Sequence, residues 1–233
     1  MKKLGIIGAM DVEIETLKSA MEHVTVTEKS GTQYYEGTLN GLPAVLVRCG
    51  IGKVNAAICA QVLCDCFAVT HIVNTGIAGS LSNDLDIGDL VISRDAMYHD
   101  FDCCHFGYAP GQVPGLPVSF PADETLIRLA KQAVEEVHPG HSKEGRVASG
   151  DLFVSHQEQK DAIIAKTGAL CTEMEGAAIA HTAHRNGVPF VILRAISDKA
   201  DNSAQMDYPA FEQQAAHRCA AVTRAFAKAL KKH

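Results

Sequence analysis

Three acidic residues, Glu13, Glu175 and Asp198, stand where this sequence predicts that secondary-structure elements begin or end. Residues 188–196 are nearly all apolar and rich in β-branched side chains, which is typical of a strand buried on both faces. Asp198 follows that strand directly after Ser197. We therefore expect its carboxylate at the carboxyl edge of a sheet, where open α/β folds bind their ligands.

Glu175 precedes an alanine-rich stretch that predicts a helix ending at Asn186-Gly187. The dipole of such a helix favours an ionised carboxylate near its N-terminus, so we expect Glu175 to be charged. Acid-assisted cleavage of a glycosidic bond requires one carboxylate that stays charged and one carboxyl group in a buried environment. Glu175 and Asp198 together indicate that chemistry.

Glu13 lies just beyond a short apolar strand predicted at residues 4–9, in the first turn of a helix. We expect Val12, Leu17 and Met21 to mark the buried face of that helix. Taken alone, Glu13 is more simply interpreted as a solvated glutamate that the helix dipole favours. Its position beyond the carboxyl end of a strand still makes it a candidate for the site.

Two glycine-rich turns follow further predicted strands. Gly50-Ile51-Gly52 follows residues 42–49, and Gly76-Ile77-Ala78-Gly79 follows residues 71–75. Glycines at strand ends let backbone and ligand approach closely, although each turn alone is weak evidence. If these strands are parallel neighbours, both turns and the acidic residues converge on one side of the sheet.

Strands and helices alternate along the chain, which indicates the α/β class with helices on both faces of one sheet. A hairpin is predicted from residues 32–36 and 42–49 around Asn40-Gly41. Further strands are expected at 89–93 and 146–149, and further helices at 54–67, 122–137 and 208–232. We predict a three-layer α/β/α sandwich with a mostly parallel, mixed central sheet, formed by a single domain over residues 1–233.

Residues 99–120 show no helical or strand period and carry several aromatic and proline residues. A loop of this length in a compact domain is usually a lid or a contact surface, so we expect it to cover a pocket or a subunit interface. It contains His99, Cys103, Cys104 and His105, whose spacing is unlike that of zinc ligands. We interpret them as loop and packing residues, not as a metal site.

The composition excludes several classes of partner. The chain has 233 residues and a formal net charge of −6, whereas binding to nucleic acid or an anionic membrane needs a basic surface. No stretch approaches the roughly 20 apolar residues of a membrane span. The apolar run after Met1-Lys2-Lys3 is too short for a secretory signal, and the eight cysteines form no CxxC pair. We expect a cytoplasmic protein with free thiols.

Several stretches, spread from one end of the chain to the other, carry a family resemblance: GIIGAMDVEIETL, CGIGKVNAA, NTGIAGSL, IGDLVIS, YHDFDCCHFGYAPGQVPG, SGDLFV, TEMEGAAIAH and RAISDKAD. In this order they resemble the 5′-methylthioadenosine/S-adenosylhomocysteine nucleosidases, within the nucleoside phosphorylase superfamily. EMEGAAIAH and RAISDKAD are specific for the superfamily, and GIIGAM followed by Glu13 is specific for the nucleosidases.

The resemblance implies an activity as well as a fold. It implies irreversible hydrolysis of the N-glycosidic bond of methylthioadenosine and S-adenosylhomocysteine, and also of 5′-deoxyadenosine, with water as nucleophile and adenine as a product. Such an activity belongs to methionine salvage and to the recycling of S-adenosylmethionine by-products. The family pattern requires no cofactor and no metal, and it implies a homodimer.

The resemblance also implies roles for the acidic residues. Asp198, positioned by Ser197, would be the general acid that protonates N7 of the adenine. Glu13 would be the base that activates the attacking water, with Arg194 close to both. Adenine leaves poorly as an anion, so general acid catalysis of this kind contributes on the order of 100- to 10,000-fold. An aspartic acid can deliver a proton near neutral pH only if burial raises its pKa.

Other positions are carried over as substrate contacts. Glu175 would hold the ribose hydroxyls, Met174 would pack on the sugar, Phe153 would stack on the purine, and the backbone of Val154 would recognise the purine edge. Further substrate-binding candidates are Glu173, Ile77, Ala78 and Gly79, and the candidates for the alkylthio pocket are Met10, Ile51, Phe106, Pro114 and Tyr208. The loop that carries Cys103, Phe106 and Tyr108 would lie near the pocket of the partner in a homodimer.

Three alternatives remain at this point. The first is phosphorolysis, because phosphorylases of the same superfamily bind phosphate through arginines after the first strand and at the third-strand turn. This chain has Glu13 and Asn74-Thr75-Gly76 at those places, with no arginine, and the carboxylate of Glu13 would repel phosphate. Hydrolysis of futalosine-type substrates shares the water chemistry and stays open. A protein that only binds nucleosides would have little reason to retain buried carboxylates.

Three departures from the family pattern leave the substrate preference open. Ile77 stands where many relatives have a serine, and Tyr208 stands where a phenylalanine is common. Cys103 replaces an aliphatic residue near the same pocket. The sequence therefore does not decide among methylthioadenosine, S-adenosylhomocysteine and 5′-deoxyadenosine.

Overall fold

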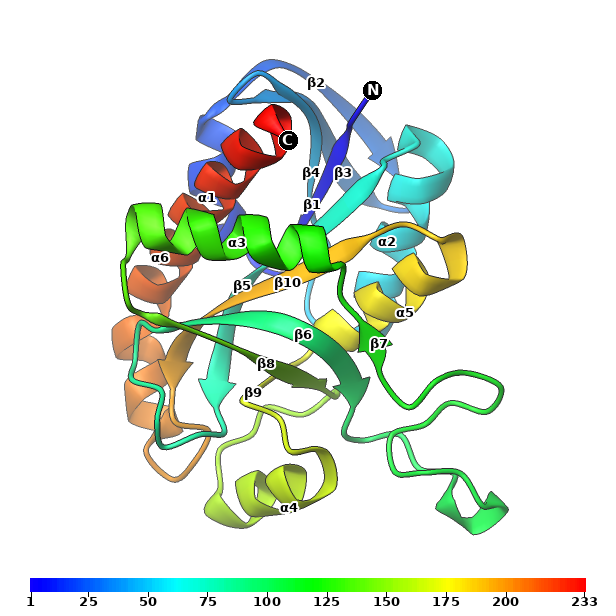
Figure 1. Ribbon diagram of the computed structural model, residues 1–233, viewed down its shortest axis with the longest axis vertical. Helices are drawn as coiled ribbons and strands as arrows, with labels where there is room; N and C mark the ends of the chain where they lie inside the picture. Colours follow the sequence, from blue (N-terminus) through cyan, green and yellow to red (C-terminus); the bar gives the residue numbers. More distant parts are fainter.

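A mixed β-sheet runs through the computed structural model, which describes residues 1–233, and helices cover both faces of that sheet (Figure 1). The strands are β1 (Leu4–Gly8), β2 (Met21–Lys29), β3 (Thr32–Leu39), β4 (Leu42–Arg48), β5 (His71–Ser80), β6 (Leu90–Tyr98), β7 (Phe120–Pro121), β8 (Ser142–Ser149), β9 (Cys171–Glu173) and β10 (Phe190–Asp198). The helices are α1 (Asp11–Ser19), α2 (Lys53–Phe67), α3 (Glu124–Val137), α4 (Gln157–Thr167), α5 (Gly176–Asn186) and α6 (Ala204–Lys232), with a short 3-10 turn, η1 (Cys104–Phe106).

The centre of the sheet is parallel. Strands β4, β1, β5 and β10 lie side by side and run in the same direction. Strand β6 pairs antiparallel with β10, and β8 and β9 connect β6 back to β5, so that these five strands close into a ring. Because β1, β5 and β10 are parallel, their carboxyl ends meet at one edge of the sheet.

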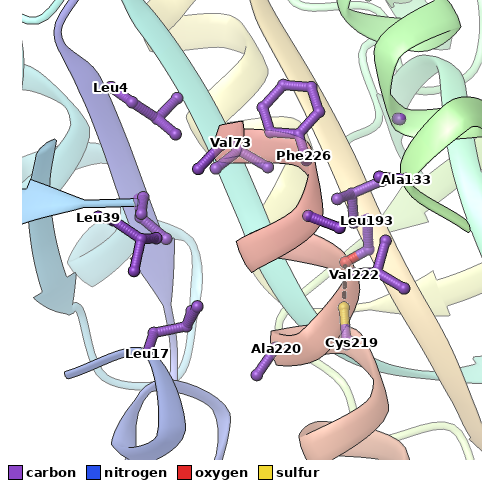
Figure 2. Close-up of a cluster of buried hydrophobic side chains, with 14 of the residues drawn as sticks. Leu4, Leu17, Leu39, Val73, Ala133, Leu193, Cys219, Ala220, Val222 and Phe226 are labelled. Atoms are coloured by element: carbon purple, nitrogen blue, oxygen red, sulfur yellow. Dashed lines mark hydrogen bonds between the residues drawn. The ribbon is translucent and has the colours of Figure 1, made fainter. Parts of the chain in front are cut away.

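The helices form two layers. Helices α1, α3 and α6 pack on one face of the sheet, and α2 and α5 pack on the other (Figure 1). The spacing of Ala215, Cys219, Val222 and Phe226 along α6 places them on one face of that helix, against Leu193 of β10 (Figure 2). Burying a large apolar side chain such as Phe226 contributes about 1.5–3 kcal/mol, so this face holds α6 to the sheet.

The two termini lie next to each other. Strand β1 begins at Leu4, and the Nζ of Lys2 donates a hydrogen bond to the carbonyl of Leu230 near the end of α6 (3.2 Å). Both ends of the chain therefore lie at the amino end of β1, and Figure 1 shows them close together.

The predicted fold class is confirmed: the chain forms an α/β sandwich with helices on both faces of a mixed sheet. The predicted role of Met21 is wrong, because α1 ends at Ser19 and Met21 begins strand β2. Strand β2 lies at the edge of the sheet with exposed side chains on both faces, so its sequence has no alternating apolar pattern. Helix α4 was also not predicted, since it buries only Lys160, Ile163 and Thr167.

The glycine-rich stretch from Gly76 to Gly79 is not a turn after β5. It is the last part of that strand, which continues to Ser80 and pairs with β10. The expected loop at 99–120 is largely irregular, contains only η1 and the start of β7, and extends away from the sheet (Figure 1). None of the helices is both long and apolar enough to span a bilayer, and all eight cysteines are free.

Candidate active site

A cavity opens where the carboxyl ends of β1, β5 and β10 meet, as expected for ligand sites in α/β sheets. Its volume of about 110 Å³ is smaller than the roughly 300–1,000 Å³ that is typical of small-molecule pockets. It is lined by Ala9, Met10, Glu13, Ile51, Ile77, Ala78, Gly79, Phe153, Thr172, Glu173, Met174, Glu175, Arg194, Ser197, Asp198 and Tyr208. The cavity therefore joins residues from both halves of the chain, including four carboxyl groups and one arginine.

Glu13 is held rigidly although it is almost completely buried. Its Oε2 accepts hydrogen bonds from the N–H groups of Ala9 (2.6 Å) and Met10 (3.0 Å), and its Oε1 accepts one from the N–H of Ile77 (3.0 Å). Burial raises the pKa of Glu13, while the charge of Arg194 and these three N–H donors act in the opposite direction. The carboxylate thus has one fixed orientation at the start of α1.

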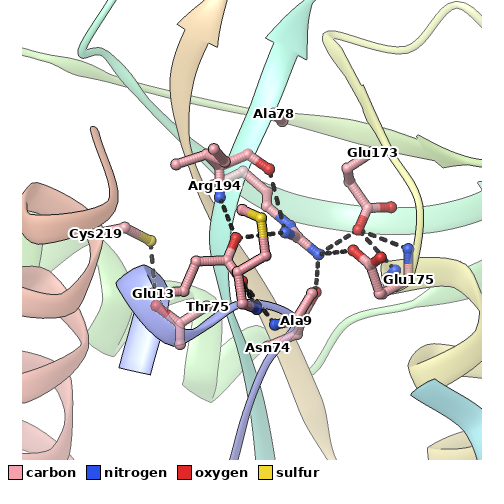
Figure 3. Close-up of polar contacts among 12 residues, drawn as sticks. Ala9, Glu13, Asn74, Thr75, Ala78, Glu173, Glu175, Arg194 and Cys219 are labelled. Carbon is pink, nitrogen blue, oxygen red and sulfur yellow. Dashed lines mark hydrogen bonds and ion pairs between the residues drawn. The ribbon is translucent and has the colours of Figure 1, made fainter. Parts of the chain in front are cut away.

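Arg194 is the buried cation at the centre of this network (Figure 3). Its Nη2 donates to Asn74 Oδ1 (2.7 Å), to Glu175 Oε2 (3.4 Å) and, in a short contact, to Glu173 Oε2. Its Nη1 lies 3.7 Å from Glu13 Oε1. Burial opposes the charge of the guanidinium, but the three surrounding carboxylates outweigh it and raise the pKa of Arg194. The arginine therefore stays charged and neutralises part of the acidic cluster.

Glu173 fixes this arginine from the other side. Its Oε2 also accepts the N–H groups of Glu175 (3.1 Å) and Gly176 (2.8 Å), and its Oε1 accepts a short hydrogen bond from the hydroxyl of Ser149. The Glu173 carboxylate thus accepts four hydrogen bonds from protein donors, three of them on Oε2, which leaves it little capacity for a ligand. The structure gives it the position of a support for Arg194 and for the start of α5.

Glu175 is the N-terminal flanking residue of α5, and its Oε1 accepts a hydrogen bond from the N–H of Gly52 (2.9 Å). Gly52 has a φ of 100°, which only glycine adopts easily, and this conformation directs its N–H at the carboxylate. Burial raises the pKa of Glu175 to about 7, with Arg194 lowering it and Glu173 raising it. Burial beside other carboxylates therefore opposes the effect of the helix dipole, and Glu175 is partly ionised near neutral pH.

Asp198 has a different environment from Glu13. Its Oδ2 accepts a hydrogen bond from the Ser197 hydroxyl (2.8 Å), and its Oδ1 accepts one from the N–H of Ala200 (2.8 Å). Burial raises the pKa of Asp198; these two hydrogen bonds lower it, and the charges of Asp207 and Asp201 raise it further. No cation is paired with this carboxyl group. Asp198 therefore favours its protonated form more than a solvated aspartate does.

Gly76 is the residue that lets Glu13 and Arg194 approach each other across β5. A Cβ at this position would lie 2.8 Å from the Cδ of Glu13 and still closer to Glu13 Oε1 and Arg194 Nη1. Its neighbour Ile77 contributes backbone groups on both sides, because its N–H donates to Glu13 and its carbonyl accepts from Arg194 Nη1 (3.1 Å). The side chain of residue 77 is not needed for either contact, so an isoleucine is compatible with this geometry.

Phe153 and Tyr208 form the outer wall of the cavity. Their rings meet edge to face, with centroids 5.4 Å apart, and Phe153 is 46% exposed. The Tyr208 hydroxyl donates to Glu212 Oε1 (3.0 Å) and lies 3.4 Å from the sulfur of Met10. This wall combines an apolar surface with one polar group at the mouth of the cavity.

Most of the candidate residues lie in this one cavity, and five do not line it: Val154, Cys103, Phe106, Tyr108 and Pro114. Val154 is buried behind Phe153, but its backbone N–H and carbonyl make no hydrogen bond within the protein. Phe106 is 76% exposed, and Tyr108 and Pro114 lie on the same outward loop, away from the cavity. The reason is that residues 99–120 extend outward instead of folding back over the sheet (Figure 1).

Sequence reasoning did not predict how three residues support the charged groups of the site. The side-chain oxygen of Asn74 accepts a hydrogen bond from Arg194, and the hydroxyl of Ser149 donates one to Glu173. The N–H of Gly52 donates one to Glu175. Asn74 and Ser149 are completely buried at positions within strands, which is a signal that a polar partner must be near. The sequence alone could not identify that partner.

Comparisons with known proteins agree with this geometry. The model of the phosphorylase superfamily matches residues 3–228. The 5′-methylthioadenosine/S-adenosylhomocysteine nucleosidase of Halalkalibacterium halodurans is 44% identical over 216 residues, which cover 92% of this chain and 93% of that protein. The chain belongs to the 5′-methylthioadenosine/S-adenosylhomocysteine nucleosidase family. The resemblance stated from the sequence motifs is thus confirmed.

Solved structures extend the likeness of this nucleosidase-family chain to three dimensions. The nucleosidase of Neisseria meningitidis in complex with methylthio-immucillin-A has a TM-score of 0.95 and 41% identity, with 98% of this chain and 99% of that chain covered. The futalosine hydrolase of Helicobacter pylori strain 26695 has a TM-score of 0.93 and 32% identity, with 97% of each chain covered. The same fold therefore supports hydrolysis of more than one nucleoside.

Proposed function

We propose that this chain hydrolyses the N-glycosidic bond of 5′-methylthioadenosine and S-adenosylhomocysteine, and also of 5′-deoxyadenosine, with water as the nucleophile. The observation that supports this best is the contrast between two buried carboxyl groups in one cavity. Glu13 has Arg194 and three N–H donors to stabilise its charge, whereas Asp198 has acidic neighbours and no cation. Such a contrast assigns the base to Glu13 and the acid to Asp198.

The reaction then proceeds with a balanced transfer of protons. The carboxyl group of Asp198, oriented by Ser197, donates its proton to N7 of the adenine as the bond from C1′ to N9 breaks. The carboxylate of Glu13 accepts a proton from the water whose oxygen forms the new bond to C1′. Adenine leaves as a neutral base, and the ribose keeps its 5′ substituent.

The acidic cluster stabilises the positive charge that develops on the sugar. Glu13 and Glu175 are preorganised around the position of the ribose, so their charges need no reorganisation during the reaction. Glu175 would accept hydrogen bonds from the ribose hydroxyls, and Met174 would pack against the ring. The Nε of Arg194 is buried without a partner, which leaves a donor for the attacking water or a hydroxyl.

The base and the 5′ substituent would occupy adjoining parts of the cavity, because the rings of Phe153 and Tyr208 are in contact. Phe153 would stack on the adenine, and the free N–H and carbonyl of Val154 would bind its polar edge. Ile77, Ala78 and Gly79 would line the same region from β5. The alkylthio group would lie against Met10, Ile51 and Tyr208, which line the cavity together.

Phosphorolysis is disfavoured by the charge of the site. The cavity contains four carboxyl groups, whereas its arginine is already shared among three of them. A phosphate dianion placed beside Glu13 would be repelled in this buried environment, and a neutral water molecule would not. Water is therefore the nucleophile that the electrostatics support.

The decisive experiment measures adenine release by the purified chain. Methylthioadenosine should be cleaved at the same rate with and without phosphate, and Asp198→Asn should lower kcat by at least about 100-fold while nucleoside binding stays measurable. Strict dependence on phosphate would overturn the hydrolytic assignment. An unchanged rate in Asp198→Asn would remove this residue from the mechanism.

A futalosine-type activity is the second candidate, because a futalosine hydrolase shares this fold at 32% identity. The value of kcat/KM for futalosine should be at least about tenfold below that for methylthioadenosine, since Tyr208 and Met10 form a narrow, mainly apolar wall. A higher value for futalosine would reverse the assignment of the substrate.

We also infer a homodimer in which the second copy completes the cavity. Ile51, Val54 and Ile58 are 54%, 69% and 44% exposed, and their spacing places them on one face at the start of α2. Ile51 and Phe153 both line the cavity and remain about half exposed, so this apolar face and the cavity mouth are continuous. The outward loop with Cys103, Phe106, Tyr108 and Pro114 would then reach the cavity of the other copy.

The dimer is tested by measuring molar mass by light scattering. The wild-type chain should have twice the mass of one chain, and Val54→Asp should give monomers with a raised KM. A monomeric wild type with full activity would contradict this arrangement.

We infer a cytoplasmic setting as well, because all eight cysteines are free thiols and reducing compartments keep them so.

A further inference from the structure

A cluster of metal-ligating side chains lies outside the cavity, where three segments of the chain meet. Asp89 precedes β6, His138 follows the last turn of α3, and His141 precedes β8. One potential ligand atom from each of these residues lies within 4.8 Å of the other two. No other group of three or more histidine, cysteine, aspartate or glutamate residues in the chain has this arrangement.

We propose that Asp89, His138 and His141 bind a divalent cation of the zinc class. Two imidazole nitrogens and one carboxylate oxygen are a ligand set typical of Zn²⁺, Ni²⁺ and Co²⁺, whereas Mg²⁺ and Ca²⁺ prefer oxygen ligands alone. Three protein ligands leave the fourth tetrahedral position for water.

The three side chains are already oriented toward one another. His141 Nδ1 lies 2.9 Å from Asp89 Oδ1, and the rings of His138 and His141 stack with centroids 4.0 Å apart. The other oxygen of Asp89 accepts the N–H of Asp86 (2.8 Å), which fixes the orientation of the carboxylate from behind. Supporting hydrogen bonds of this kind are typical of metal ligands.

Binding requires only a small rearrangement. Bonds of about 2.0–2.2 Å to a tetrahedral zinc ion place ligand atoms roughly 3.3 Å apart, and the ligand atoms lie within 4.8 Å of one another, so the widest pair must close by at most about 1.5 Å. The side chain of His141 is 54% exposed and can turn, which also opens its stacked ring away from His138. The ion replaces the hydrogen bond between His141 and Asp89, so no buried polar group is left without a partner.

The charges around the cluster act in both directions on a bound cation. The C-terminal end of α3, with its partial negative charge, points at the cluster. Arg218 lies nearby and donates to the carbonyl of Gly88 (3.0 Å), and its charge limits the affinity.

The proposed ion would connect two loops of the fold. The turn from His138 to His141 follows α3, and Asp89 ends the loop that precedes β6. The carbonyl of Asp89 accepts the N–H of Ile196 (2.9 Å), so the same loop is hydrogen-bonded to β10. A bound cation would hold both loops in place and increase the stability of the folded chain.

The test is a calorimetric titration of the full chain with ZnCl₂, after chelator treatment and alkylation of exposed thiols. One equivalent should bind, and the melting temperature should rise by a few degrees in excess zinc. The affinity for zinc should fall by about tenfold or more in His141→Ala and in Asp89→Asn. The rise in melting temperature at the same zinc concentration should shrink accordingly. Activity without zinc serves as the measure of correct folding, because neither residue lies in the cavity.

A matched control is His184→Ala. His181 and His184 have the same spacing as His138 and His141, but they belong to no cluster with a carboxylate. His184→Ala should bind zinc like the wild type. The proposal is overturned if the wild type binds no zinc, or if zinc binds equally well to the double variant His138→Ala/His141→Ala.

Discussion

The substitution Gly76→Ala tests the catalytic geometry without removing any polar group. The added methyl carbon would lie 2.8 Å from the Cδ of Glu13, whereas ordinary contacts of a Cβ begin at 3.4 Å. The Glu13 carboxyl group must therefore move by at least about 0.6 Å, and its partner Arg194 must move with it. Neither can move freely, because Glu13 accepts three backbone N–H groups and Arg194 has four oxygen partners in the same network.

A misplacement of this size next to the reacting atoms lowers the rate on the order of 100-fold, which corresponds to about 2.7 kcal/mol in activation free energy. We expect kcat for adenine release to fall by this factor, while KM changes little because Phe153 and Tyr208 are untouched. The assay measures the initial rate on methylthioadenosine across substrate concentrations, with the melting temperature recorded in parallel.

Gly5→Ala is the matched control for this substitution. Gly5 is also a buried glycine in the parallel part of the sheet, but its added carbon would meet only the flexible side chains of Leu63 (3.1 Å) and Val69 (3.3 Å). Gly5→Ala should therefore lower stability without lowering kcat. A Gly76→Ala enzyme that keeps more than about a third of the wild-type kcat would refute the claim that Glu13 and Arg194 are fixed beside residue 76.

Three other substitutions test the electrostatics of the site. Asp207→Asn removes a charge that raises the pKa of Asp198, so the alkaline limb of the profile of kcat/KM against pH should shift to lower pH by about half a unit. If the pKa of that limb stayed the same, Asp198 would be excluded as the titrating acid. Tyr208→Phe removes the hydroxyl that donates to Glu212 and makes the wall apolar, so KM for methylthioadenosine should fall relative to KM for S-adenosylhomocysteine; the ratio of the two is the readout, and a constant ratio would contradict a role in specificity. Burial raises the pKa of Glu175 from 4.5 to about 7, so the contribution of its protonated form to stability is present below pH 4.5 and lost as pH rises through 7. The free energy of unfolding of Glu175→Gln, measured in urea, should therefore rise by about 3 kcal/mol relative to that of the wild type between pH 4.5 and 8. A pH-independent difference between these two proteins would contradict that pKa.

The sequence predicts well which strands form the site and which residues follow them, since the strands are recognisable as short apolar stretches. Asp198 could be placed at the edge of the sheet because the buried run before it reads as a strand. The charge state of Glu175 could not be predicted, because it depends on Glu173 and Arg194, which approach it only in the folded chain. The local sequence predicts that the helix dipole keeps Glu175 charged, whereas burial in the folded chain acts against that charge.

The support of Arg194 was beyond sequence reasoning for the same reason. Asn74 lies 120 positions from Arg194 in the chain, yet it supplies a buried acceptor for the guanidinium. The cluster of Asp89 with His141 spans 52 positions and has no recognisable spacing. Strand β2 escaped prediction because an edge strand with two exposed faces has no apolar period.

The neighbouring chain ends have a practical consequence for engineering. Lys2 touches Leu230 at the amino end of β1, whereas substrates would enter at the opposite end of that strand. A purification tag or a fused reporter on either end would therefore leave the entrance clear. A short linker could also join the two ends, so that new ends opened at the exposed turn of Ser30 and Gly31 between β2 and β3 would yield a circular permutant that retains the hydrolytic centre.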